Sequence, residues 1–230
     1  SVWGDLDNDG DLDILAGDPS NQWWVLHQNQ LVETGSVGFT GVNSAVGLSP
    51  GDHQSALLFF DMENDGDLDI FSGFNGSGSN RLFRNDLSGG KWLDLKLVGV
   101  DSNRDGIGAR ITLVAGGRTQ YRQHTVYNSI SSGTLSSRIH FGLDSATTVD
   151  QLTIDWPSGQ TQFLYNIASN QVLEVTEPAK TLWTWGRNSS GQLGDGTTAQ
   201  KNTPTQESTG AADWTAIATD DGNTVALKSD

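Results

Sequence analysis

Short apolar runs separated by polar, glycine-rich stretches make up most of the chain. Residues 56–60 and 68–74 are two such runs, rich in strand-forming residues and bounded by Gly, Asn or Ser, which is typical of β-strands. About seven more lie between residues 91 and 178, from 92–99 to 171–177. No long window repeats apolar residues with a helical period, and 28 glycines interrupt helical patterns. The pattern predicts an all-β protein with few helices.

Two nine-residue windows repeat one acidic motif. Residues 5–13 read D-L-D-N-D-G-D-L-D and residues 61–69 read D-M-E-N-D-G-D-L-D. The flanking residues 14–17 also match 70–73, so the two copies of the repeat are offset by 56 residues. That period is the size of a four-stranded propeller blade rather than of a short solenoid coil. The sequence therefore predicts partial β-propeller blades in this part of the chain.

The distribution of charge predicts three modules. The chain carries a formal net charge of −15, and residues 1–90 hold 14 acidic but only two basic residues. Residues 91–178 hold eight acidic and seven basic residues, and residues 179–230 hold six and four. So few bases exclude a nucleic-acid-binding face. No apolar run approaches the ~20 residues of a membrane span, so we expect no membrane insertion.

The acidic windows have the composition of calcium loops. Carboxylates on alternate residues, followed by a glycine that permits a sharp turn, wrap oxygen ligands around a hard cation. An EF-hand is excluded, because its Glu at position 12 is replaced by Ala16 after the first window and by Ser72 after the second. Position 9 can close the site instead, and an Asp/Gly-rich turn without an ion is the alternative. The sequence predicts two calcium sites, whose candidate ligands are Asp5, Asp7, Asp9, Asp11 and Asp13 in the first and Asp61, Glu63, Asp65, Asp67 and Asp69 in the second.

A third segment, residues 101–106, begins with the same spacing of polar residues. It has Ala109 where the closing ligand belongs, and Arg104 adds a competing cation. We therefore expect a structural turn there, without a bound ion.

Catalytic residues are not evident, and we expect no enzyme activity. The four His residues, at 27, 53, 124 and 140, lack metal-ligand spacing. Asp52, His53 and Ser55 are close in sequence, but adjacency in a loop does not define a catalytic triad. We expect a packed ring with one hydrogen bond for His140. Of the eight Trp residues, those at 23, 24, 92, 156, 183, 185 and 214 fall in strand-like segments, which favours core packing, with an aromatic platform for sugars as the alternative. The pair at 23 and 24 is the exception, because strand alternation sends one of the two outward.

Three stretches resemble known families. The acidic windows with their strands are similar to FG-GAP/VCBS calcium-loop propeller repeats. Residues from about 80 to 178 resemble the ASPIC/UnbV domain of cartilage acidic protein-like proteins. The matching segments are N-R-L-F-R-N at 80–85, S-N-R-D-G-I-G-A-R at 102–110, H-F-G-L at 140–143, W-P-S-G at 156–159 and N-Q-V-L at 170–173. Residues 182–230 resemble one regulator-of-chromosome-condensation repeat, in L-W-T-W-G-R-N at 182–188 and G-Q-L-G-D-G at 191–196.

These resemblances imply a truncated propeller of two calcium-binding blades in residues 1–90, a β-sandwich-like domain in 91–178 and a single blade of a second propeller in 179–230. They imply a calcium-binding interaction or adhesion module at the cell surface or outside the cell, with a protein or glycan partner. The alternatives are a glycan-binding module of a secreted protein and, less favoured, part of a propeller hydrolase.

Overall fold

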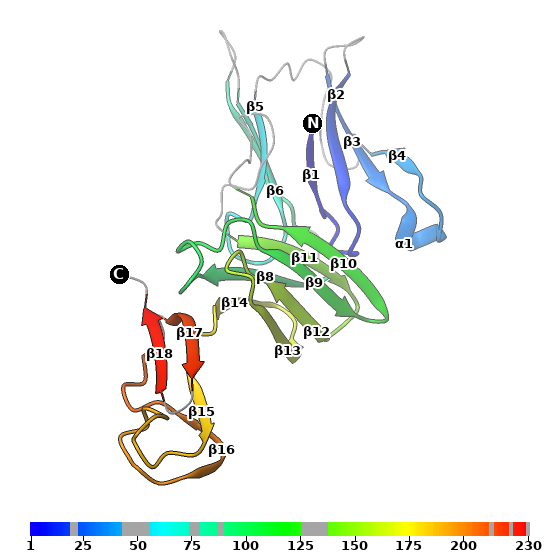
Figure 1. Cartoon of the computed structure of the whole chain (residues 1–230). Helices are drawn as coiled ribbons and strands as arrows, with labels where there is room; N and C mark the ends of the chain where they lie inside the picture. Colours follow the sequence, from blue (N-terminus) through cyan, green and yellow to red (C-terminus); the bar gives the residue numbers. More distant parts are fainter. Residues whose placement is uncertain are drawn as a thin grey trace. The chain divides into compact units, whose positions relative to one another are not determined.

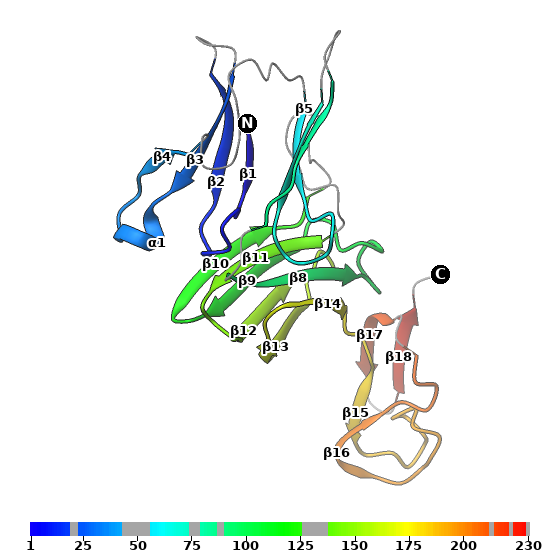
Figure 2. The same cartoon turned by 180° about the vertical axis from the view of Figure 1, so that it is seen from behind.

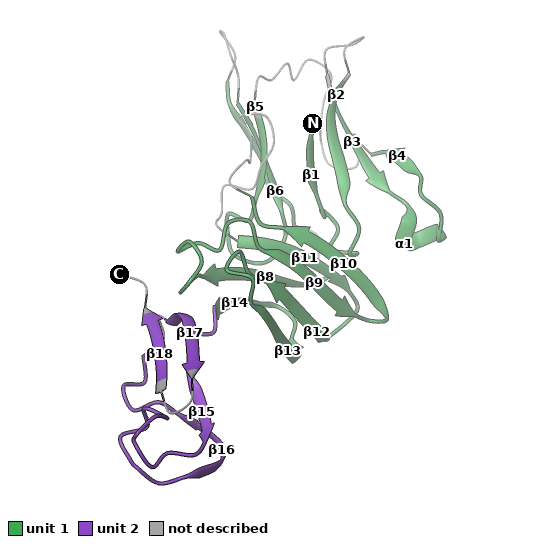
Figure 3. Cartoon of the chain, viewed as in Figure 1, with its two compact units in different colours: residues 1–176 green, residues 177–230 purple. Residues whose placement is uncertain are grey.

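The computed structural model describes residues 1–18, 23–42, 56–73, 79–86, 90–125, 138–211, 214–220 and 223–228. In these ranges the regular secondary structure is almost all β-strand (Figure 1), which confirms the prediction of an all-β protein. The helix α1 (Leu31–Thr34) is a single turn, and no helix in these ranges has the length and apolarity needed to cross a bilayer. The chain divides into two compact units, Ser1–Thr176 and Glu177–Asp230 (Figure 3).

The two acidic windows each connect the first two strands of an antiparallel sheet. The first sheet has the order β1 (Val2–Gly4), β2 (Asp13–Asp18), β3 (Trp23–Asn29) and β4 (Phe39–Gly41). The second has the order β5 (Ala56–Phe60), β6 (Asp69–Gly73) and β7 (Arg81–Phe83). Equivalent strands are offset by the period of the sequence repeat, as expected for two copies of one blade-like unit.

The two sheets bury one common core. Strand alternation sends apolar side chains of both repeats into the space between the sheets, where they lose contact with water. The members of this cluster are Val2, Leu6, Leu15, Leu26, Leu57, Phe59, Leu68 and Ile70. Each sheet therefore uses its neighbour to cover its apolar face, which is how adjacent units of a repeat array stabilise one another.

Residues 91–176 form two further sheets. One has the order β10 (Arg118–Gln123), β9 (Arg110–Ala115), β12 (Thr148–Asp155) and β13 (Thr161–Ala168). The other has the order β11 (Arg138–Asp144), β8 (Lys91–Val98) and β14 (Gln171–Thr176), with β14 parallel to β8. Both contribute to one buried apolar cluster, so the arrangement is sandwich-like. In the two opposite views, the loop ends of the first two sheets lie next to β8, β10 and β11 (Figures 1 and 2).

The second unit contains two hairpin-like pairs, β15 (Trp183–Gly186) with β16 (Lys201–Gln206) and β17 (Trp214–Asp220) with β18 (Asn223–Lys228). Its turns converge on Asn188, which is fully buried and donates to Asp195 Oδ1 at 3.0 Å and to backbone carbonyls.

The Trp side chains do not all lie in a core. Trp92 of β8 and Trp156, directly after the end of β12, are buried, as expected. Trp183 and Trp185 are 51% and 62% exposed, so the expectation of core packing is wrong for both. The reason is strand alternation, because the two lie on one face of β15 while Thr184, on the other face, is the covered residue.

Candidate metal centre

The first acidic loop, residues 5–13, folds around the side chain of Asp5. Asp5 Oδ1 accepts a hydrogen bond from Asp9 N at 3.1 Å, and Oδ2 accepts one from Gly10 N at 3.0 Å. Asn8 and Gly10 have φ angles of 61° and 103°, which turn the chain sharply. The left-handed conformation is accessible to Gly and tolerated by Asn, which explains these residue types in the motif.

The second acidic loop, residues 61–69, repeats this conformation. Asp61 accepts from Asp65 N at 3.1 Å and from Gly66 N at 3.0 Å. Asn64 and Gly66 have φ angles of 59° and 92°. The repeated sequence thus encodes a repeated loop geometry.

The carboxylates at position 9 hold the loops to their sheets. Asp13 Oδ2 accepts from Leu6 N and Oδ1 from Asn29 N, both at 2.9 Å. Asp69 makes the same two bonds, with the equivalent backbone groups of the second repeat. Both oxygens of each side chain therefore already accept a backbone hydrogen, and these two predicted ligands act first as anchors of the loop.

Three carboxylate oxygens in the first loop are buried without a hydrogen-bond partner. They are Oδ1 of Asp7, Oδ2 of Asp9 and Oδ1 of Asp11. A buried charged acceptor that lacks a partner costs more than the roughly 1–3 kcal/mol of a neutral one. A cation bound among these oxygens would remove that cost. The donor set of the first loop therefore fits a hard metal ion.

The pKa values of the first-loop carboxyl groups are raised. Burial, together with neighbouring carboxylates, raises the pKa of Asp9 and of Asp13 to about 7. Burial also raises the pKa values of Asp7 and Asp11, and it raises that of Asp5 well above the usual range. Without a metal ion, Asp9 and Asp13 therefore retain protons close to neutral pH. A bound cation would take the place of those protons.

The structure brings two overlapping groups of carboxylates together in the first repeat. Asp5, Asp7 and Asp9 each place an oxygen within 4.8 Å of the others, and so do Asp9, Asp11 and Glu33. Glu33 lies in α1, beyond the loop, and the motif does not identify it. Its signal in the sequence is weak, because it is the lone acidic residue between Asp18 and Asp52.

The second loop is less suited to a cation than the first. In the described ranges no group of three second-loop carboxylates comes within that distance. Glu63 is exposed, and its Oε1 lies 3.3 Å from Nε of Arg84, so an internal cation already pairs with it. Burial and the neighbouring Asp65 and Asp61 raise the pKa of Asp67 to about 6.

Asn8 joins the two loops to each other. It is almost fully buried, and its Nδ2 donates to Asp67 Oδ1 at 2.9 Å and to the carbonyl of Gly66 at 3.0 Å. Its Oδ1 lies 2.8 Å from His140 Nε2. The same amide therefore links both loops to β11 of the neighbouring sheet.

The first loop is also attached to the sandwich-like part by backbone contacts. Gly142 N donates to Asp5 Oδ2 at 3.0 Å, and Asp144 N donates to the carbonyl of Asn8 at 2.7 Å. Arg118 donates to the carbonyl of Asp9 at 2.8 Å. The conformation of the first loop is thus held both by its own hydrogen bonds and by hydrogen bonds from the sandwich-like part.

His140 makes two hydrogen bonds rather than the one expected. Its Nδ1 lies 2.9 Å from Asp94 Oδ1, and its Nε2 faces Asn8. An Asp–His pair is part of a catalytic triad, but here the third group is an amide, which is not a nucleophile. His53, with Asp52 and Ser55, lies outside the described residues.

The segment 101–106 forms a turn held by its own side chains. Asn103 Oδ1 accepts from Ile107 N, and Asn103 Nδ2 donates to the carbonyl of Ile107, both at 2.8 Å. Arg104 Nε lies 3.1 Å from Asp105 Oδ1. The carboxylate is already paired with a cation, in agreement with a structural turn.

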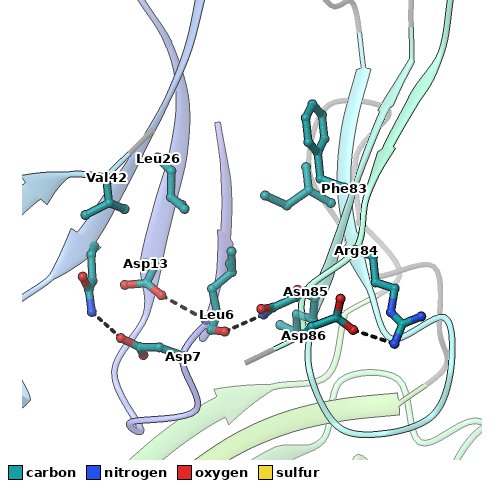
Figure 4. Close-up of a pocket in the computed structure, with 12 residues that line it drawn as sticks. Leu6, Asp7, Asp13, Leu26, Val42, Phe83, Arg84, Asn85 and Asp86 are labelled. Carbon is teal, nitrogen blue, oxygen red and sulfur yellow. Dashed lines mark hydrogen bonds and ion pairs between the residues drawn. The ribbon is translucent and has the colours of Figure 1, made fainter. Parts of the chain in front are cut away.

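A pocket of about 390 Å³ lies between the sheets of the two acidic repeats (Figure 4). Asn85 spans its base by donating to the carbonyl of Leu6 at 2.8 Å. Its walls include apolar side chains such as Leu26 and Phe83, and Asp7 lies at its polar end. Asp7 therefore borders open space as well as the acidic loop.

Comparison with protein families finds two matches. The model of the family described as ASPIC and UnbV matches residues 99–182, which contain β9 to β14. The model described as Regulator of chromosome condensation (RCC1) repeat matches residues 181–227, which contain most of β15 to β18. Both resemblances inferred from the sequence are confirmed in these ranges, while that of residues 1–90 to FG-GAP/VCBS repeats stays a prediction. No curated protein matches the chain.

Proposed function

We propose that this chain is a calcium-dependent binding module. In this proposal calcium holds the acidic loops in the conformation in which they pack against the sandwich-like sheets of the first unit. The observation that carries the proposal is the set of three buried, unpartnered oxygens on Asp7, Asp9 and Asp11. Calcium accepts six to eight oxygen ligands in flexible geometry, whereas magnesium retains its waters and needs a near-ideal octahedron. A crowded loop of carboxylates therefore favours calcium.

The position of the loops gives calcium a structural role. Asp5, Asn8 and Asp9 contact both the acidic repeats and the sandwich-like sheets. An ion that neutralises and orders the first loop would rigidify these contacts before a partner binds, which lowers the entropy cost of association. We propose a protein or glycan partner and an extracellular or cell-surface setting, where modules with weak calcium sites are common.

Calorimetric titration of the chelator-treated 230-residue chain with calcium tests the proposal. We expect two binding events, of which Asp9→Asn removes the tighter one and leaves the other. Asp150→Asn, outside both loops, is the control and keeps both events. The absence of calcium heat at millimolar ion in the folded wild-type chain would overturn the proposal.

Two exposed Trp side chains favour a second candidate function, glycan binding by the second unit. Trp183 and Trp185 present their rings on one face of β15, and exposed aromatic faces suit stacking against sugars. Titration with soluble polysaccharides should quench Trp fluorescence in the wild type and much less in Trp185→Ala. Equal quenching in Trp185→Ala and in Trp3→Ala, which removes an exposed Trp of the first unit, would contradict this function.

A further inference from the structure

Glu33 is brought to the first acidic loop by the turn α1. One of its carboxylate oxygens lies within 4.8 Å of an oxygen of Asp9 and of an oxygen of Asp11. The loop motif ends at Asp13, so Glu33 reaches the cluster from beyond β3, outside the motif. Three like charges at this separation repel one another unless a cation lies among them.

Two hydrogen bonds hold Glu33 in this place. Asp11 Oδ2 accepts from the backbone N–H of Val32 at 3.1 Å, which fixes the turn against the loop. Gln28 Nε2 donates to Glu33 Oε1 at 3.2 Å and also to Asp7 Oδ2. In the described part of the chain no basic side chain is paired with Glu33, so its charge is oriented by an amide and left uncompensated.

Buried oxygens of Asp9 and Asp11 without a hydrogen-bond partner are a second observation that points to a metal ion at this cluster. Asp11 is only 8% exposed, and its Oδ1 is buried with no hydrogen-bond partner. The same holds for Oδ2 of Asp9. In the cluster of Asp9, Asp11 and Glu33, two side chains therefore carry an oxygen that accepts no hydrogen bond from the protein. Such an oxygen is available to bind a metal ion.

The second repeat shows what the arrangement looks like without this acid. The residue 56 positions after Glu33 is Gly89, and the residue 56 positions after Gln28 is Arg84. Arg84 pairs with Glu63, so a guanidinium occupies the place of the orienting amide. The first repeat thus has an additional acid, Glu33, and a neutral residue, Gln28, at these two positions. The second repeat has no acid at the first position and a cation, Arg84, at the second.

We propose that Glu33 is a calcium ligand of the first loop, binding the ion together with Asp9 and Asp11. This assignment rests on the proposed function of the loop. It makes the first site the tighter of the two, because the ligand set includes a carboxylate from outside the motif. It also couples the ion to α1, so that calcium binding orders residues of the first sheet beyond the loop.

Calcium calorimetry, supported by terbium luminescence, of the chelator-treated 230-residue chain and three variants tests the assignment. Glu33→Gln removes the charge and should weaken the tighter event about 10-fold or more, since the loss of an outer-shell partner alone typically costs that much. Glu33→Asp keeps the charge but withdraws the oxygen by one methylene, and it should also weaken that event. Glu174→Gln is the control, since Glu174 is exposed and pairs with Lys96. The weaker event should be unchanged in all three.

The outcomes separate the two proposals. Wild-type affinity in Glu33→Asp combined with weaker binding in Glu33→Gln would mean that Glu33 acts only through its charge, and would overturn the ligand assignment. Wild-type affinity in both would overturn it as well. In either case the wild-type calcium events would leave the proposed function standing. The absence of calcium binding by the wild-type chain would overturn both proposals.

Discussion

Gly142 of β11 lies directly against the first acidic loop, and its backbone N–H donates to Asp5 Oδ2. A methyl group added there would lie 2.2 Å from Asp5 Oδ2 and 2.5 Å from the Cα of Asn8. The backbone of Gly142 has no positive φ, so the substitution itself imposes no backbone strain. Gly142→Ala therefore tests the contact between loop and sheet, and no acidic residue is changed.

Two contributions determine how much the free energy of unfolding falls in Gly142→Ala. Overpacking a closed contact costs about 1–3 kcal/mol. Displacing Asp5 also weakens the hydrogen bond from Gly142 N to a carboxylate, which contributes about 1.5–3 kcal/mol. Together they lower the free energy of unfolding of the first unit by about 2.5–6 kcal/mol. Because Asp5 and Asn8 must move, we also expect weaker calcium binding by the first loop.

Urea unfolding followed by Trp fluorescence, in calcium and in chelator, measures both effects. Gly38→Ala is the matched control, because a methyl group there meets nothing within 4 Å and Gly38 has no positive φ. If Gly142→Ala unfolds like Gly38→Ala under both conditions and binds calcium like the wild type, the docking of the loop on β11 is refuted.

Three further predictions concern the same loops. Arg84→Gln should raise the calcium affinity of the weaker event in calorimetry, because it removes the cation that pairs with a second-loop carboxylate; unchanged affinity would contradict this. Asn8→Ala should lower the free energy of unfolding by roughly 2–4 kcal/mol, since it removes buried hydrogen bonds and leaves His140 without one partner. A loss below about 1 kcal/mol would show that the Asn8 amide contributes little to holding the two loops and β11 together. The folded-state pKa values of Asp9 and Asp13 are raised to about 7, so the folded chain binds more protons than the unfolded chain between about pH 4 and 7. In chelator the melting temperature should therefore fall as pH rises through that window, and calcium should reverse the fall near pH 7; a melting temperature that rises over this range would be the contrary result.

The sequence identified the acidic loops because their information is local. Alternating carboxylates, an Asn and a Gly within one short window specify both the candidate ligands and the two left-handed positions of the turn. The internal repeat then predicted that both windows adopt one conformation, and the hydrogen bonds of Asp5 and Asp61 agree. The placement of Trp92 and Trp156 in strand-like segments similarly predicted their burial, which is confirmed.

Contacts between distant segments were not predictable in this way. Glu33 is a single acid in a polar turn, and only the tertiary structure places it beside Asp11. His140 and Gly142 meet the first loop from a distant part of the sequence, with no local pattern that marks the contact. The exposure of Trp183 and Trp185 depends on which face of a two-stranded sheet is covered, which strand periodicity alone does not decide.

Anomalous diffraction from crystals of the chain grown in calcium, or with terbium in its place, tests the central claim most directly. The claim predicts an anomalous peak in the first loop, surrounded only by oxygen, at about 2.3–2.6 Å from carboxylate oxygens of Asp7, Asp9 and Asp11. A well-ordered first loop with no anomalous peak within coordination distance of these three residues, at millimolar ion, would contradict it.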